Sequence, residues 1–170
     1  MATQVAVCGP AECPDTEATA ARRVGELLAH RGAVVLCGGG PGVMAAAAAG
    51  ARGGGGLAIG ILPGADRSAV APGLSAEVAT NMGQARNAIL VTSADAVIAV
   101  GGSWGTLSEV ALAMRLGRRV VSLGGWRILD ANGDPIPGIH YATTPEQAVA
   151  AALTPTPPPP EPGSPAKCGN

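Results

Sequence analysis

The stretch AVIAVGGSWGTLSE, residues 96–109, contains the pattern that decides the fold. Its first five residues are apolar, the run ends abruptly at Gly101 and Gly102, and a helical pattern begins at Thr106. A short, continuously apolar run is typical of a strand that is buried on both faces, as in a parallel sheet. The glycines mark the turn that leads from this strand into the following helix.

The same alternation of strand and helix recurs along the chain. Repeated units of this kind predict βαβ crossovers and therefore a Rossmann-like, doubly wound α/β domain with a parallel sheet in a three-layer αβα arrangement. A run of small residues at 44–50 reflects either a bias in composition or a helix whose backbone lies close to the sheet. The expected strands are 4–8, 33–37, 57–62, 96–100, 119–123 and a short 139–142, and the expected helices are 15–31, 42–52, 84–92, 106–116 and 145–153.

The chain divides into one domain, residues 1–153, and a proline-rich tail, residues 154–170. A length of 170 residues with 47% hydrophobic residues fits one domain with a substantial core. Aliphatic side chains must fill that core, because only 2% of the residues are aromatic. The prolines of the tail disfavour helix and sheet, which predicts a disordered or polyproline II segment.

Charge and composition argue against several classes of partner. A net charge of −1 with 14% charged residues leaves no basic surface for nucleic acid or for an acidic membrane. No apolar run reaches the roughly 18 residues of a membrane span, and the first residues lack the charged start of a signal peptide, so we expect a cytoplasmic protein. Two histidines and four dispersed cysteines form no ligand cluster, so no metal site is expected.

Two glycine-rich turns, each between an expected strand and an expected helix, predict an anion-binding site. Ligands of doubly wound sheets bind at the carboxyl ends of the strands, where glycine turns expose backbone N–H groups and the next helix presents the positive end of its dipole. We therefore predict that both turns contact one phosphate. The predicted binding residues are Gly38, Gly39, Gly40 and Gly42 in the first turn and Gly101, Gly102, Ser103, Gly105 and Thr106 in the second.

The surrounding residues narrow the class of phosphate ligand. A nucleoside-triphosphate P-loop needs a lysine after its glycines, and neither turn has one. A dinucleotide fingerprint needs an acidic residue about 20 positions after its first glycine, where this chain has Ala58. A smaller ligand, such as a nucleoside monophosphate, fits the two turns better.

Several motifs resemble those of the LOG family, named after plant cytokinin-activating enzymes. The resemblance covers 4–153 and is strongest to a branch of bacterial LOG-like and DprA-related proteins near the molybdenum-cofactor carrier proteins. It implies a homodimer and a phosphoribohydrolase that cleaves a purine or cytokinin nucleoside 5′-monophosphate to free base and ribose 5-phosphate, without a metal or organic cofactor. The motifs are GGGPGVM at 38–44, ILPG at 61–64, NMGQARN at 81–87, SADAVIAVGG at 93–102 and GTLSE at 105–109.

The resemblance also implies two catalytic residues. Glu109 occupies the glutamate position of the family motif PGGxGTxxE, and Arg86 matches the family's arginine. Glu109 would then face the ribose, while Arg86 would bind the phosphate or orient Glu109. Two structural alternatives remain: Thr106 and Glu109 also spell a capping box, and Arg86 also fits a solvated arginine at a helix start.

The chain departs from the family motif at three positions. Gly101 replaces the motif's proline, Ser103 replaces its second glycine, and Asn87, a further predicted nucleotide contact, stands where a lysine commonly follows the arginine. The altered turn supports a second hypothesis, a non-catalytic protein that binds or carries a nucleotide or the molybdenum cofactor. Trp104, within this turn, is expected either to anchor the loop while partly buried or to stack on a base.

The label "lysine decarboxylase", which LOG-like proteins often carry, is rejected. Such decarboxylases hold pyridoxal phosphate on a lysine, and the single lysine of this chain, Lys167, lies in the tail.

Overall fold

A seven-stranded sheet with the order β4-β3-β2-β1-β5-β6-β7 forms the centre of the computed structural model. The model describes residues 1–67 and 70–154, so the predicted proline-rich tail lies outside the described residues. Every pair of neighbouring strands is parallel, which confirms the predicted Rossmann-like α/β fold. The strands are β1 (Gln4–Cys8), β2 (Val34–Cys37), β3 (Ala58–Leu62), β4 (Ala76–Ala79), β5 (Ala96–Val100), β6 (Arg119–Leu123) and β7 (Ile139–Ala142).

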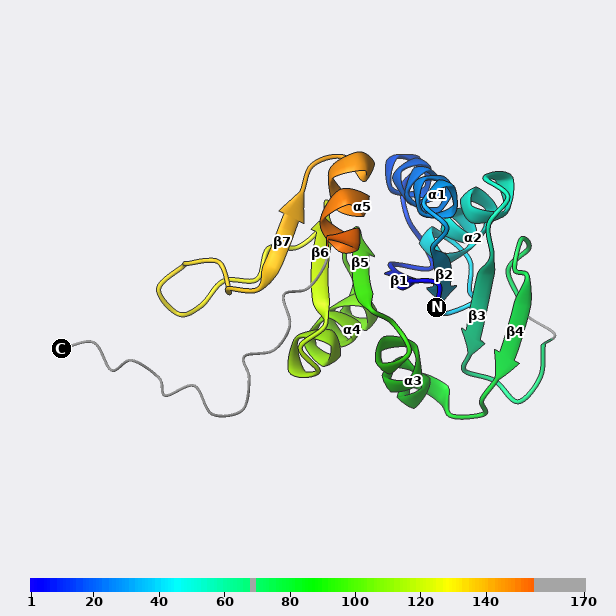
Figure 1. The fold of residues 1–170 in the computed structure, drawn as a ribbon. Helices are drawn as coiled ribbons and strands as arrows, with labels where there is room; N and C mark the ends of the chain where they lie inside the picture. Colours follow the sequence, from blue (N-terminus) through cyan, green and yellow to red (C-terminus); the bar gives the residue numbers. More distant parts are fainter. Residues whose placement is uncertain (68–69, 155–170) are drawn as a thin grey trace, which may run out of the picture.

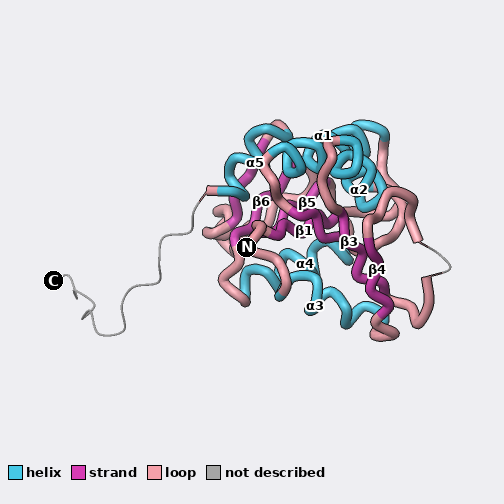
Figure 2. Tube along the Cα trace, turned by 45° about the vertical axis from the view of Figure 1, so that its right-hand side comes forward, coloured by secondary structure: helices cyan, strands magenta, loops and turns pink. Residues whose placement is uncertain are grey.

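Helices cover both faces of the sheet and give the three layers predicted from the sequence. Three of them, α1, α2 and α5, lie on one face, and α3 and α4 lie on the other (Figures 1 and 2). None of the helices in the described ranges is long and apolar enough to cross a membrane. The helices are α1 (Asp15–His30), α2 (Val43–Gly53), the one-turn 3-10 helix η1 (Gly83–Ala85), α3 (Arg86–Thr92), α4 (Trp104–Arg115) and α5 (Pro145–Leu153).

Alternate residues of the central strands enter two separate core layers. Val5 and Val7 of β1 pack toward α1, α2 and α5, whereas Ala6 and Cys8 pack toward α3 and α4. The largest fully buried side chains are aliphatic, as the scarcity of aromatic residues predicts. This alternation places the thiol of Cys8 beneath α4, at the carboxyl end of the first strand.

The small residues of α2 allow close packing against α1. A side chain at Gly50 would collide with the backbone of Arg22 in α1, and one at Gly25 would collide with the backbone of Ala47 in α2. The two helices therefore meet almost backbone to backbone. The run of small residues was expected to bring α2 close to the sheet, whereas these backbone contacts are made with α1.

The structure differs from the sequence-based expectation in three elements, the first being the expected helix 84–92, which is divided into η1 and α3. Strand β4 was not expected, because its sequence AEVA is short, polar in part and mostly exposed at the edge of the sheet. Helix α4 begins at Trp104, two residues before the expected start at Thr106. Ser103 is its N-cap, and the Ser103 hydroxyl accepts a hydrogen bond from the Thr106 amide at 3.1 Å.

Candidate functional site

The predicted site lies where the strand order reverses. Strand β1 pairs with β2 on one side and with β5 on the other, so the turns that follow these three strands emerge next to one another. Crevices at such a switch point are the usual ligand sites of open parallel sheets. The two glycine turns follow β2 and β5, and between them lies the Gly9–Pro10 turn that follows β1.

The first glycine turn borders a cavity of about 280 Å³. Gly38, Gly39 and Gly40 line it, together with Pro63 and Gly64 from the turn after β3. Its remaining lining residues are Ala11, Pro41, Met44, Leu62, Asp66, Val70 and Arg86.

Gly42, the fourth predicted residue of this turn, has a packing role in the structure. It is the N-cap of α2, with a positive φ of 64°, and a side chain there would meet the carbonyl oxygen of Pro10 at 2.5 Å. The neighbouring Val43 amide donates a hydrogen bond to the same carbonyl at 3.1 Å. One N–H group at the positive end of α2 is therefore satisfied by the β1 turn.

The second turn borders another cavity, of about 190 Å³, through Ser103, Gly105 and Thr106. The hydroxyls of Ser103 and Thr106 lie 2.9 Å apart and are hydrogen bonded. Because Ser103 caps the helix, Glu109 lies in its second turn, and the capping-box alternative for Thr106 and Glu109 is wrong. The carboxylate of Glu109 lines this cavity.

Arg86 and Glu109 are both buried and face each other across the cavity. Arg86, the first residue of α3, is 8% exposed, and Glu109 is 7% exposed. Their closest approach, from Arg86 Nη1 to Glu109 Oε1, is 3.9 Å, which is an ion pair but too long for a hydrogen bond. The prediction of a solvated arginine at a helix start is therefore wrong.

The guanidinium of Arg86 retains unused hydrogen-bonding capacity. Its Nε and Nη1 atoms are buried and have no hydrogen-bond partner among the described residues. Buried donors without a partner are destabilising by about 1–3 kcal/mol each, and more when they are charged. Arg86 lines both cavities, and so do Ala11 and Met44. The positive charge of Arg86 therefore acts on both cavities.

Burial controls the protonation of Glu109. It raises the pKa of the Glu109 carboxyl above 4.5, while the charge of Arg86 and a hydrogen bond from the Cys8 thiol act in the opposite direction. Burial and the nearby Glu109 carboxyl raise the pKa of Cys8 well above its usual value, so this thiol remains a protonated donor.

Asn87 connects the two helices beside the site. Its side-chain amide donates to the Ser108 hydroxyl of α4 at 3.3 Å, and that hydroxyl donates to the Gly105 carbonyl at 2.7 Å. The Asn87 Oδ1 atom is buried and has no hydrogen-bond partner within the described part of the chain. Asn87 lines the cavity of Glu109, so it can accept a hydrogen bond from a ligand there.

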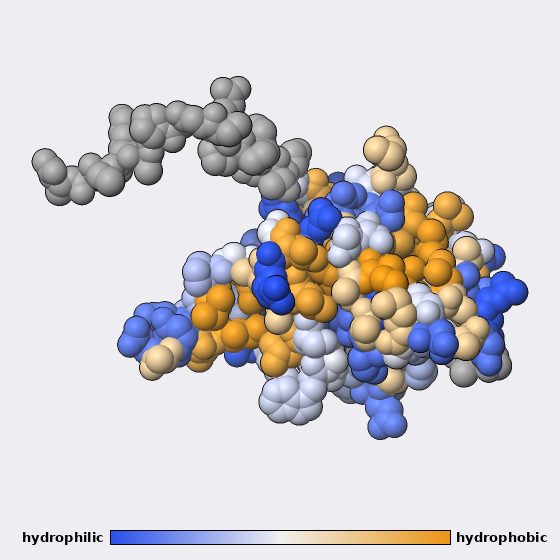
Figure 3. All heavy atoms as spheres, turned by 90° about the horizontal axis from the view of Figure 1, so that it is seen from below, coloured by the Kyte–Doolittle hydropathy of each residue, from blue (hydrophilic) through white to orange (hydrophobic). Residues whose placement is uncertain are grey.

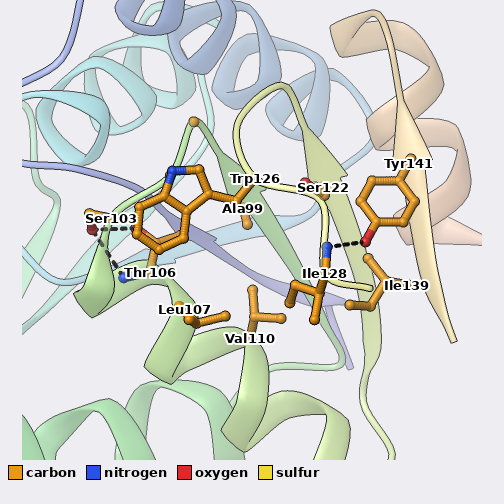
Figure 4. A pocket seen from close by; sticks show the side chains of 12 residues that line it. Ala99, Ser103, Thr106, Leu107, Val110, Ser122, Trp126, Ile128, Ile139 and Tyr141 are labelled. Atoms are coloured by element: carbon orange, nitrogen blue, oxygen red, sulfur yellow. Dashed lines mark hydrogen bonds between the residues drawn. The ribbon is translucent and has the colours of Figure 1, made fainter. Parts of the chain in front are cut away.

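Gly101 and Gly102 line a different, smaller pocket. This pocket of about 30 Å³ lies beneath Trp126 and is mostly apolar (Figure 4). Its lining residues include Ser103 and Thr106, which also border the cavity of Glu109.

Trp104 differs from its expected role as a partly buried anchor. Its side chain is 79% exposed, and its ring meets that of Trp126 edge to face, with centroids 5.0 Å apart and an interplanar angle of 74°.

Sequence reasoning missed the contributions of several loops. Gly9, Pro10 and Ala11 line the site because they follow the central strand, and the Gly-Pro pair at the end of the first apolar run was the available signal. Met44 and Gln84 carry no chemical signal that distinguishes them from packing residues. Within residues 1–67 and 70–154, no group of three or more His, Cys, Asp or Glu side chains is placed to hold a metal ion.

Comparisons with known proteins show one family and several similar structures. Residues 2–149 match the model of the SLOG cluster4 family. An uncharacterized protein of Archaeoglobus fulgidus is 42% identical over 146 residues, which cover 86% of this chain and 91% of that protein.

Two solved structures are similar over nearly their whole length. The molybdenum cofactor binding protein of the phototrophic bacterium Rippkaea orientalis superposes with a TM-score of 0.79 at 34% identity, covering 88% of this chain and 94% of that one. The molybdenum cofactor carrier protein of Chlamydomonas reinhardtii gives a TM-score of 0.79 at 32% identity, covering 89% and 96%.

Proposed function

This chain belongs to the SLOG cluster4 family, and we propose that it is a carrier that binds a phosphorylated ligand of the molybdenum-cofactor or nucleotide type around Arg86. The membership agrees with the resemblance drawn from the sequence motifs. A molybdenum cofactor binding protein and a molybdenum cofactor carrier protein have the same fold at more than 30% identity, which supports carriage over turnover.

The buried, incompletely bonded guanidinium of Arg86 is the observation that carries this proposal. A phosphate in the adjoining cavities would accept a hydrogen bond from Nε or from Nη1, the two donors that have no partner in the described residues. Charge-assisted bonds of this kind are short and strong. The side-chain-free surface of Gly38 to Gly40 lets the ligand come close to the backbone on the same side.

Molybdenum content tests the carrier function directly. The protein would be purified from a host that makes the molybdenum cofactor, and molybdenum would be measured by plasma mass spectrometry alongside native mass spectrometry of the intact protein. We expect molybdenum with the wild type and its loss in Arg86→Ala. The control is Arg52→Ala, which removes a surface arginine whose Nη1 atom donates to the Leu74 carbonyl.

Affinity for AMP tests the nucleotide form of the same proposal. Calorimetry should detect AMP binding to the wild type and to Arg52→Ala, and no binding to Arg86→Ala. A wild type that carries no phosphorylated ligand and binds no AMP would contradict the proposal.

A phosphoribohydrolase is the second candidate, favoured by the position of Glu109 in the cavity next to Arg86. In this reaction the bond between ribose C1′ and the base nitrogen breaks, the hydroxyl of water joins C1′, and the proton of that water passes to the base. The carboxylate of Glu109 would stabilise the positive charge that develops on the ribose or activate the water. It must be ionised to do so, and its raised pKa works against this at low pH.

Product analysis separates carriage from hydrolysis. AMP and isopentenyl-AMP would be incubated with the protein, and free base would be measured by chromatography. Release of base by the wild type but not by Glu109→Gln would favour the hydrolase. Unchanged nucleotide recovered after binding would favour the carrier.

We also propose that the chain forms a homodimer through α3 and α4. These two short helices cover their face of the sheet alone, and apolar side chains extend across that face (Figure 3). Ala88, Ala111 and Leu116 are exposed there, and Leu112 is half-buried. Light scattering should give twice the chain mass for the wild type and a monomer for a charged substitution such as Ala111→Glu.

A further inference from the structure

The two tryptophans of the chain lie together beside the second glycine turn. Trp104 is the first residue of α4, and Trp126 belongs to the loop between β6 and β7. Trp104 is 79% exposed and Trp126 is 43% exposed, although burial of an indole is normally favourable. A protein with only three aromatic residues therefore keeps two of them at one place on its surface.

The position of Trp126 is fixed by its surroundings. Its ring lies against Gly102, where an added side chain would come within 2.8 Å of the indole, and the adjacent Gly125 is packed against the backbone of Gly101. Two residues later, the Ile128 amide donates to the Tyr141 hydroxyl at 3.1 Å (Figure 4). The ring is thus held in place before any ligand arrives.

The tryptophan pair adjoins the cavity of Arg86 and Glu109. Ser103 and Thr106 border that cavity on one side and the pocket beneath Trp126 on the other. The hydrogen-bonded hydroxyls of Ser103 and Thr106 thus lie between the charged region and the aromatic one. A ligand whose phosphate lies at Arg86 can therefore extend over Ser103 to the indoles.

We infer that Trp104 and Trp126 bind the flat heteroaromatic ring, a purine or a pterin, of the ligand whose phosphate is held at Arg86. This inference rests on the proposed function. The pocket beneath Trp126 has room for about one or two water molecules and none for a ring, so the ring stacks on the exposed indole faces. Stacking of bases on aromatic side chains is favourable and tolerant of base identity.

A comparison of AMP with ribose 5-phosphate tests the inference, because the two probes share the phosphorylated sugar and differ in the ring. Calorimetry on the wild type should give about tenfold tighter binding of AMP. Trp104→Leu, which keeps an apolar side chain without the flat ring, should lose most of that advantage and bind ribose 5-phosphate as the wild type does. The control is Leu129→Ala, an exposed apolar residue of the same loop as Trp126.

Fluorescence provides an independent readout, since the sequence contains only these two tryptophans. AMP should change the emission, and ribose 5-phosphate should change it far less. Trp126→Leu keeps the exposed Trp104 as the single reporter and should retain part of the AMP response.

The possible failures are distinguishable. If both probes bind equally well, or if Trp104→Leu binds AMP like the wild type, the inference is wrong while the role of Arg86 stands. If neither probe binds the wild type, the nucleotide form of the proposed function fails and the inference fails with it. If Trp104→Leu changes only the mass seen by light scattering, the pair is a protein interface and the inference is again wrong.

Discussion

The guanidinium of Arg86 lies directly against Gly38, so a side chain at Gly38 would begin 2.5 Å from two guanidinium nitrogens. Because Gly38 has no side chain, the guanidinium of Arg86 has room to lie where Arg86 lines both cavities. Because the neighbouring atoms belong to the end of a flexible side chain, an added methyl group would displace the guanidinium rather than the backbone.

Gly38→Ala should therefore abolish ligand binding with little effect on the fold. We expect the free energy of unfolding to change by less than about 1 kcal/mol, since the displaced group can move. Affinity for AMP and the amount of copurified molybdenum should both fall to the level of Arg86→Ala. The control is Gly53→Ala, at a position with open space around it. Unchanged binding in Gly38→Ala would show that the guanidinium position is unimportant.

Glu109→Gln should change the pH dependence of stability in a defined direction. Folding raises the pKa of Glu109, so the folded state binds the carboxyl proton more tightly than the unfolded state does. The stability that this proton contributes is fully present below about pH 4.5 and is lost as pH rises through the raised pKa. The free energy of unfolding of the wild type should thus fall relative to Glu109→Gln, by about 1.4 kcal/mol for each unit of pKa shift.

Thermal melts of both proteins between about pH 4 and pH 8 measure this difference. Replacement of the neutral carboxyl by an amide adds an offset that does not depend on pH, so only the change with pH is informative. Melting temperatures that stay parallel across this range would contradict the pKa shift of Glu109.

Ser103→Ala should destabilise the protein by about 1 kcal/mol, the usual effect of removing an N-cap side chain. Thr106→Val should have a smaller effect, because the Thr106 hydroxyl bonds only to Ser103 among the described residues. Chemical denaturation measures the free energy of unfolding of both variants and shows which of them is destabilised more. The reverse order would place the start of α4 at Thr106.

Thiol reactivity should follow the burial of the cysteines. In a Cys168→Ser background, which removes the cysteine outside the described residues, Cys13 should react quickly with an aromatic disulfide reagent although burial and nearby carboxylates raise its pKa. Cys8 and Cys37 are buried, and burial raises the pKa of each, so both should react only after unfolding. More than one fast thiol, or a fast thiol that persists in an added Cys13→Ser, would contradict this assignment.

The sheet was predictable because its central strands obey a simple rule. Residues 5–8 of β1 and all of β5 are buried on both faces, so these stretches are continuously apolar, and a glycine follows each of them. Strand β4 escaped prediction because an exposed edge strand carries no such run, and its Glu77 interrupts the only apolar residues there.

The predicted site residues follow a similar division. The glycine turns could be located because a strand, a turn and a helix follow one another in the sequence. The burial of Arg86 could not, because it depends on how α3 packs against the β2 turn, which is far away in the chain. The start of α4 was misplaced because tryptophan and glycine are weak helix formers, and only the Ser103 hydroxyl defines the helix end.

The placement of Arg86 just after the edge strand has a consequence for ligand exchange. Among the described residues, strand β4 pairs only with β3. The segment between β4 and α3 is held to the end of β3, where the Thr80 hydroxyl donates to the Leu62 carbonyl and the Asn81 amide donates to the Gly64 carbonyl. Local opening of a protein costs less free energy at its margins than in its core strands. In the proposed carrier, fraying there would withdraw the guanidinium of Arg86 and release the ligand while the central strands remain closed, so release would need no global unfolding.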